Sequence, residues 1–191
     1  MVTTPIKKKE DIDVLKHYFL SKKEYRNHAL FVMGINTAMR ISDLLQLKWK
    51  DVYDFGMCQY KEHLYITEQK THKRSCIAIN SSCMDALELL RKYVNPLSCN
   101  EYIFCADSNR QRPISRNRAY HIIKNAASAN HIEGNISCHS LRKTLGYQAW
   151  KAGNPPALIM NVYNHSSMDI TKRYLAIDQD DRDELFYTIN L

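Results

Sequence analysis

The 191-residue sequence lacks an apolar run long enough to cross a bilayer, and its first residues, MVTTPIKKKED, lack the apolar core of a signal peptide. It contains no Gly/Ser-rich linker, low-complexity tract or internal repeat. Its six cysteines form no C-x-x-C pair and no regular framework, which favours reduced thiols over disulfides or a zinc site. Neither these cysteines nor the eight histidines offer a ligand set at metal spacing, so we expect no metal. Together these absences favour a cytoplasmic protein with no membrane partner.

The residues that are present have the balance of an ordinary soluble globular protein. Hydrophobic residues make up 45% of the chain and charged residues 25%, and the length suffices for one sizeable domain with a small appendage. The formal net charge is +7. This excess of positive charge favours an anionic partner without identifying it.

Apolar residues recur at helical spacing over most of the chain. Residues 1–10 are polar and basic, so we expect an arm or linker there. The spacing predicts helices over residues 11–20 and 25–36, a short one capped by Ser42, one capped by Ser81 or Ser82 and ending before Pro96, and one opened by Ser115.

Two β-prone runs, residues 64–67 and 76–79, flank the polar turn 68–74. They predict an antiparallel hairpin with Lys70 in or beside its turn, whereas residues 97–114 are predicted to be loop. The expected fold is therefore mainly α (α+β), with a small antiparallel β-sheet. We expect one domain over residues 11–177 and a C-terminal tail at 178–191.

Arg40 is predicted on the turn just before the short helix capped by Ser42, in an apolar neighbourhood. An unpaired buried charge is very costly, so this arginine needs a partner. Asp43, three residues later, is a candidate.

Residues 138–175 bring together the side chains that suggest chemistry. His139 and Arg142 are three residues apart in a predicted helix, so they share a face. His165 and Tyr174 follow after short turns. Two histidines, an arginine and a tyrosine in one segment suggest chemistry on a phosphate.

Turn and cap residues organise the same segment. Gly153, followed by prolines, predicts a helix end and a restart at Pro156. Asn164 suits a left-handed helix cap. Ser166 with Asp169 resembles the start of the helix that leads to Tyr174.

At six places the sequence resembles the tyrosine recombinases, the phage-integrase type of site-specific DNA recombinase. The residues that carry the resemblance are Arg40 in TAMRISDLL, Lys70 in the hairpin, His139 and Arg142 in CHSLR, His165 in YNHSS and Tyr174 in TKRYL. Ala38 and Asn164 stand where the family usually has glycine, and Asp43 replaces the commoner glutamate. None of these departures removes a catalytic group.

The resemblance implies a helical catalytic domain that cleaves and rejoins DNA through a covalent 3′-phosphotyrosine, without ATP, metal or other cofactor. Arg40 and Arg142 would hold the phosphate oxygens as paired guanidiniums. Tyr174 would be the nucleophile, and His139 is the nearest candidate for its base.

The other two assignments also come from the family pattern. Lys70 would protonate the leaving 5′-hydroxyl, with Lys73 close enough to compete, and His165 would hydrogen-bond a phosphate oxygen. Taken singly, each residue has an ordinary explanation. Lys70 suits a solvated turn, His165 a helix cap, and Arg40 with Asp43 a structural ion pair.

Net charge and resemblance together imply double-stranded DNA as the partner, in a bacterial or phage setting. We expect a monomer in free solution, a homotetramer on DNA, and accessory proteins that bend the DNA. Backbone phosphate contacts, which give affinity without sequence choice, are expected from Lys73, Arg110, Arg112, Arg116, Arg118, Lys143, Lys172 and Arg173.

Two other functions remain open at this point. A type IB topoisomerase shares the chemistry but relaxes supercoils as a monomer, and a non-catalytic DNA-binding regulator could keep the same fold.

Family members usually carry an N-terminal DNA-clamping domain, for which this sequence has no room. It therefore corresponds to an excised catalytic domain or to a naturally short recombinase, similar to the fimbrial phase-variation recombinases. After an acidic stretch, Leu185, Phe186 and Ile189 predict the apolar stripe of a tail helix. The resemblance implies that this helix docks on a neighbouring subunit, and local packing on its own chain is the alternative.

Overall fold

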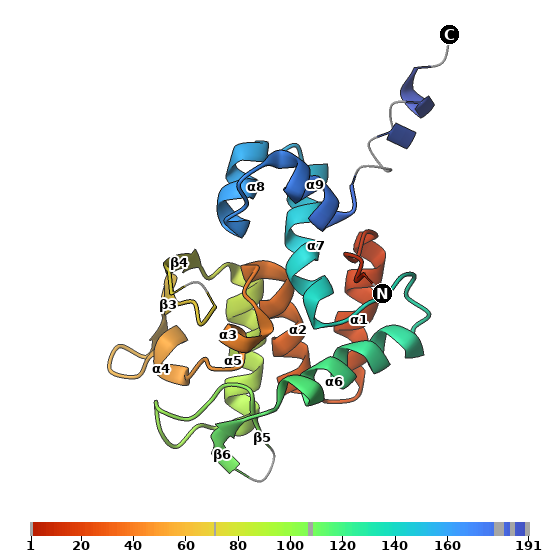
Figure 1. Cartoon of the computed structure of the whole chain (residues 1–191). Helices are drawn as coiled ribbons and strands as arrows, with labels where there is room; N and C mark the ends of the chain where they lie inside the picture. The colour runs from red at the N-terminus through yellow and green to blue at the C-terminus, as the bar shows by residue number, and fades with distance from the viewer. Residues whose placement is uncertain (1, 71, 107–108, 178–181, 184–185, 190–191) are drawn as a thin grey trace.

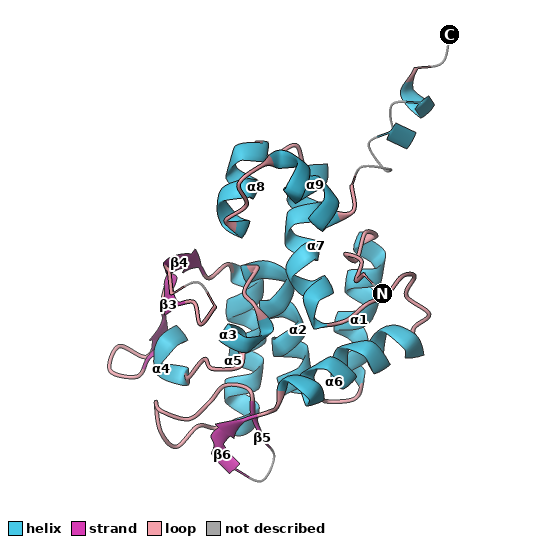
Figure 2. Ribbon diagram, in the orientation of Figure 1, coloured by secondary structure: helices cyan, strands magenta, loops and turns pink. Residues whose placement is uncertain are grey.

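The computed structural model describes residues 2–70, 72–106, 109–177, 182–183 and 186–189, and helices dominate it (Figures 1 and 2). The long helices are α1 (Lys9–Ser21), α2 (Tyr25–Thr37), α5 (Ser81–Val94), α6 (Arg116–Ala129) and α7 (Cys138–Lys151). The short ones are α3 (Ile41–Leu44), α4 (Trp49–Val52), α8 (Pro156–Tyr163) and α9 (Met168–Leu175). The predicted mainly helical fold is confirmed. Among these residues no helix combines the length and apolar character needed to cross a bilayer.

The strands form small antiparallel pairs rather than one sheet. They are β1 (Tyr53–Asp54) with β2 (Gln59–Tyr60), β3 (His63–Thr67) with β4 (Arg74–Ala78), and β5 (Cys105–Ala106) with β6 (Asn109–Pro113). The β3–β4 pair confirms the predicted hairpin, with Lys70 in its turn. The β5–β6 pair corrects the expectation of loop at 97–114. Its strands carry no apolar alternation, and flanking backbone bonds, such as that from Ile114 N to Phe104 O at 2.8 Å, hold them together.

Helix α2 is the centre of the main core. Most of its residues are buried, as the nearly uniform apolar pattern predicts, and it contacts α1, α5 and α7. Large aromatic side chains from other segments, including Phe19, Trp49 and Phe104, complete this core. This packing fixes the position of the C-terminal end of α2, which Arg40 follows three residues later.

A second, smaller cluster joins α7, α8 and α9, which lie together at one end of the molecule (Figure 1). Gly146 in α7 makes this packing possible, because a Cβ there would lie 2.7 Å from side-chain atoms of Tyr163 and Leu175. The cluster holds the helix that carries Tyr174.

The N-terminal residues, predicted to be an arm or linker rather than core, pack against the domain and contribute Ile6 to its core. Ile6 is 1% exposed, and its backbone N–H donates to Thr144 Oγ1 at 2.9 Å. Lys143 Nζ donates to the carbonyl oxygen of Thr3 at 2.6 Å. Residues 3–7 therefore lie along α7.

The helix caps differ from the predictions by one or two residues. Arg40 occupies the N-cap of α3 instead of Ser42, Asn80 caps α5 instead of Ser81 or Ser82, and Ser167 caps α9 instead of Ser166. Ser115 caps α6 as predicted. Asn164 ends α8 with the predicted left-handed backbone, at φ 55°.

Of the predicted C-terminal tail the structure describes residues 182–183 and 186–189, which lie away from the body (Figure 1). Phe186 and Ile189, two members of the predicted apolar stripe, are 77% and 58% exposed. Leu185 and residues 178–181 lie outside the described residues.

Candidate active site

A cavity of about 460 Å³ lies between the end of α2, the β3–β4 hairpin, α7 and α8. Two of the predicted catalytic residues, Arg40 and Arg142, line it although they lie far apart in the sequence. Its other polar lining residues include Asp43, Glu68 and Lys73. The cavity thus combines cations with two buried carboxylates.

The partner of Arg40 is Glu68, not Asp43. Arg40 Nη1 donates to Glu68 Oε2 at 2.5 Å, and Ser75 Oγ donates to Glu68 Oε1 at 3.2 Å. Asp43 instead accepts a hydrogen bond from the backbone N–H of Gln69, at 3.1 Å, through Oδ1. The two carboxylates therefore fasten the start of the hairpin turn to the segment around α3, and this corrects the predicted Arg40–Asp43 pair.

Arg142 is buried in α7, and its Nη1 donates to the carbonyl oxygen of Ala38. Ala38 ends α2 in the left-handed conformation, at φ 51° and ψ 19°, which explains why the resemblance places glycine at this position. The Arg142 guanidinium also lies 5.0 Å from the centre of the Tyr163 ring. Both arginines are therefore fixed by protein groups.

Tyr174 packs among the aromatic side chains of the site. Its ring centre lies 5.4 Å from that of His139 and 5.1 Å from that of His165, both edge to face. Its hydroxyl oxygen is covered and meets no hydrogen-bond partner of regular geometry within the described chain. Burial raises the pKa of Tyr174, whereas the charge of Arg142, the approach of its guanidinium to the hydroxyl and the charge of Arg40 act in the opposite direction.

Both histidines have pKa values below the ordinary range. Burial lowers the pKa of His139, helped by surrounding positive charges, first that of Lys143. Burial and the charge of Arg142 lower the pKa of His165. His165 Nδ1 lies 3.1 Å from Thr171 Oγ1. Near neutral pH both imidazoles are therefore mainly uncharged.

The two candidate lysines differ in position. Lys70 is exposed in the hairpin turn, close enough to His139 to lower its pKa. Lys73 lines the cavity and donates to Asn164 Oδ1 at 3.1 Å. The structure thus keeps both as candidates for the proton donor.

The predicted DNA-contacting residues fall into two groups. Arg112, Arg116, Arg118 and Arg173 are exposed, and Lys172 is half-buried with its ammonium 5.5 Å from the Trp150 ring centre. Two others, the half-buried Arg110 and the buried Lys143, are bound to protein carbonyl groups. Arg110 donates to the carbonyl of Val94 at 2.9 Å, and Lys143 is 3% exposed and bound to Thr3.

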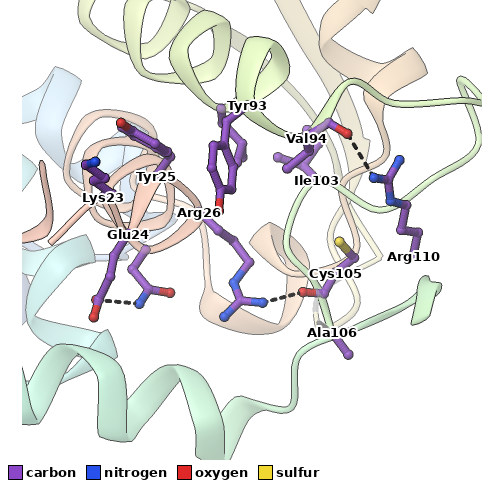
Figure 3. Close-up of a pocket in the computed structure, with 12 residues that line it drawn as sticks. Lys23, Glu24, Tyr25, Arg26, Tyr93, Val94, Ile103, Cys105, Ala106 and Arg110 are labelled. Atoms are coloured by element: carbon purple, nitrogen blue, oxygen red, sulfur yellow. Dashed lines mark hydrogen bonds between the residues drawn. The ribbon is translucent and has the colours of Figure 1, made fainter. Parts of the chain in front are cut away.

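A second cavity, of about 420 Å³, lies at the opposite end of α2 and contains none of the predicted catalytic residues (Figure 3). The rings of Tyr25 and Tyr93, 4.8 Å apart, form part of its wall. Its arginines bind backbone carbonyls, as in the 2.8 Å bond from Arg26 Nη1 to Cys105 O. These bonds tie the β5–β6 segment to the helices.

Three contributors to the site were not predicted. Glu68 belonged to a turn that we took as solvated, and no periodicity marks its burial. Tyr163 donates to the carbonyl of Arg142 at 2.6 Å and accepts from the backbone of Gly146 at 2.9 Å. Thr171 is the third. The only feature of the sequence that could have indicated its role is its position one turn after the N-cap residue of α9.

Comparison with known proteins identifies relatives of this chain. The model of the Phage integrase family matches residues 8–181. The probable integrase/recombinase YoeC of Bacillus subtilis is 41% identical over 179 residues, which cover 94% of this chain and 92% of that protein. Among solved structures, XerA recombinase aligns with 98% of this chain and 65% of its own, at a TM-score of 0.77 and 18% identity. XerH bound to palindromic difH substrate aligns with 96% of this chain and 52% of its own, at a TM-score of 0.74 and 17% identity. These two establish likeness of fold, and this chain spans about half to two-thirds of their length.

Proposed function

Because the chain belongs to the phage integrase family of tyrosine recombinases, we propose that it is a site-specific DNA recombinase that acts through a covalent 3′-phosphotyrosine. The observation that supports this reaction is the packing of Tyr174 against His139 and His165. A single ring, that of Tyr163, contacts both Tyr174 and Arg142, which lines the cavity with Arg40. The proposed nucleophile Tyr174, its base His139 and the arginines that would bind the phosphate thus form one connected set of side chains.

The arginines would stabilise the charge that develops on the phosphate. Attack at phosphorus places negative charge on the non-bridging oxygens, and guanidiniums bind such oxygens in bidentate fashion. Arg40 is held by Glu68 and Arg142 by the Ala38 carbonyl, so neither needs large reorientation. Losing one such preorganised donor costs about a hundredfold to a thousandfold in rate.

The chemical step needs one proton acceptor and one proton donor. The Tyr174 oxygen bonds to phosphorus while the bond from phosphorus to the 5′ oxygen breaks. His139, neutral because of its lowered pKa, takes the phenol proton. Lys70 gives a proton to the leaving 5′ oxygen, with Lys73 as the alternative donor. Attack by the 5′-hydroxyl of a second strand reverses these transfers and reseals the DNA.

The covered hydroxyl of Tyr174 sets a condition on this reaction. Its oxygen has to become accessible before it can reach a phosphate held between the arginines. Helix α9 is short and ends at Ala176 with a left-handed backbone. A shift of α9 on DNA binding would uncover the nucleophile.

The partner is double-stranded DNA, bound through its backbone by the exposed basic residues. Arg112, Arg116 and Arg118 lie together from β6 into the start of α6 and supply positive charge without base contacts. XerH is bound to a palindromic substrate, and palindromic sites present equal halves to two copies of a protein. We extend this to a homotetramer on DNA, with the tail of each chain packed against a neighbour.

Covalent trapping tests the function. A nicked DNA target that cannot be religated should yield a denaturant-stable protein–DNA adduct without added metal. Tyr174→Phe should bind DNA and form no adduct. Relaxation of supercoiled plasmid without strand exchange would indicate topoisomerase activity instead. DNA binding with no adduct from the wild-type protein would favour the non-catalytic regulator.

A further inference from the structure

We propose that Thr171 is a positioning residue, whose hydroxyl accepts the Nδ1–H of His165 and leaves Nε2 as the ring nitrogen available to substrate. The inference rests on the proposed function for its catalytic meaning. Thr171 is completely buried, in the first turn of α9. Its Oγ1 lies 3.1 Å from His165 Nδ1 and 3.2 Å from the carbonyl oxygen of Ser167.

The single hydroxyl hydrogen of Thr171 determines the direction of these bonds. A carbonyl oxygen can only accept, so the contact with Ser167 requires the Thr171 hydrogen. Oγ1 can then serve His165 only as an acceptor, and Nδ1 must carry the ring hydrogen. In the opposite arrangement Thr171 Oγ1 and the Ser167 carbonyl oxygen, 3.2 Å apart, would face each other without a hydrogen between them, although that carbonyl would still accept the Thr171 backbone N–H at 3.3 Å. The repulsion between two acceptor oxygens disfavours that arrangement.

Neighbouring rings hold the orientation that this bond selects. His165 stacks on Tyr163 with ring centres 5.5 Å apart and an interplanar angle of 27°. Tyr163 is itself anchored through hydrogen bonds with Arg142 and Gly146. With Nδ1 engaged, Nε2 is the nitrogen that remains for a phosphate oxygen or a hydroxyl group.

The tautomer constrains the chemistry of His165. In the neutral ring Nε2 has a lone pair and accepts hydrogen bonds, so it can donate to a phosphate oxygen only after protonation. The negative charge of a bound phosphate would favour that protonation. The titratable and charged groups that face the ring are Arg142 of α7, Tyr163 of α8 and Tyr174 of α9, with Lys73 of the hairpin bound to the adjacent Asn164. His165 therefore engages DNA phosphate with uptake of one proton.

Nitrogen NMR of histidine-labelled, DNA-free protein at neutral pH tests the assignment directly. The His165 signals, identified by their loss in His165→Asn, should show a protonated Nδ1 and a bare Nε2. Thr171→Val keeps the shape but removes the acceptor, and should shift His165 toward the Nε2–H tautomer. Thr171→Ser should retain the wild-type pattern. Thr144→Val is the matched control, because the buried Thr144 hydroxyl makes the same bond to the carbonyl four residues back without touching a histidine.

Cleavage of a suicide substrate supplies the second measurement. Thr171→Val should slow adduct formation about tenfold, the effect of losing one hydrogen bond to a charged group, while Thr171→Ser stays near wild type. A wild-type spectrum with Nε2–H, or a Thr171→Val spectrum identical to wild type, overturns the proposal. The spectra need no DNA cleavage, so a correct tautomer in a protein that never forms an adduct would contradict the proposed function and leave this assignment standing.

Discussion

The Glu68 carboxylate, at the base of the β3–β4 turn, accepts a 2.5 Å hydrogen bond from the Arg40 guanidinium that follows α2. This ion pair fastens the turn that carries Lys70 to the arginine that would bind phosphate. The orientation of Arg40 and the position of the turn that carries Lys70 therefore both depend on the buried Glu68 side chain.

Glu68→Gln should lower both stability and activity. It removes the charge that Arg40 binds while keeping the side-chain shape, so we expect a loss of about 2 kcal/mol in the free energy of unfolding. Adduct formation should slow because Arg40 loses its fixed orientation. Urea denaturation and single-turnover cleavage measure the two effects. Asp13→Asn, which breaks the exposed pair with Lys16, is the control and should cost about 0.5 kcal/mol at most. Equal effects of the two substitutions would contradict the role given to Glu68.

Two adjacent tyrosines should respond oppositely to loss of their hydroxyls. Tyr174→Phe removes a covered oxygen whose polar neighbour is the Arg142 guanidinium, and Arg142 keeps its bond to the Ala38 carbonyl, so stability should stay the same or rise. Tyr163→Phe abandons the bonds to Arg142 and Gly146 and should cost about 1–3 kcal/mol. Thermal and urea denaturation of the two variants provides the test. A destabilised Tyr174→Phe would show that its hydroxyl is bonded in solution.

The proton donor can be identified with a substrate that needs no proton. Sulfur at the bridging 5′ position leaves readily as a thiolate. Lys70→Ala should cleave ordinary DNA slower by a factor on the order of a hundred or more, and the sulfur-substituted strand at close to the wild-type rate. Lys73→Ala is the matched variant in the same hairpin. If the sulfur substitution instead rescues Lys73→Ala, Lys73 is the proton donor. If it rescues neither variant, neither lysine donates the proton, and both act by orienting other groups of the site.

The fold was predictable wherever the sequence has periodic apolar spacing. Helices α1, α2, α5 and α6 and the β3–β4 hairpin were found in this way, whereas β5–β6 was missed because backbone bonds and arginine contacts hold it. Caps were misplaced where two capping residues adjoin, as at Asn80 and Ser81, because sequence alone does not select between them. Motifs pointed to the candidate catalytic side chains. Their partners Glu68 and Thr171 emerge only from tertiary contacts, which no local pattern encodes.

The acid limit of the reaction should follow His139. Its pKa lies below the ordinary value of 6.5, so the neutral base persists at pH 6.5 and is lost only as the pH falls further. When the DNA concentration is low, the pH dependence of the cleavage rate follows the ionisation of the DNA-free protein. The fall in rate on the acid side should therefore be centred below pH 6.5. The cations that lower this pKa are Lys143, Arg142, Arg40 and Lys70. Lys143→Met should move this fall in rate to higher pH, and Lys16→Met, whose charge is not among those that lower the pKa of His139, should leave it in place.

The exposed tail should act in assembly rather than in folding. Phe186 and Ile189 are largely solvent-exposed and lie away from the body, so these two side chains contribute little to the core of their own chain (Figure 1). The acidic residues that precede them suit a basic neighbour and are repelled by DNA phosphates. Removing residues 179–191 should weaken the multi-subunit complex on paired DNA sites, measured by native gel electrophoresis and light scattering. The shortened protein should melt cooperatively at the wild-type temperature and still form the adduct at a single site. A loss of cooperative melting in the DNA-free monomer would place the tail in its own core and contradict packing on a neighbour.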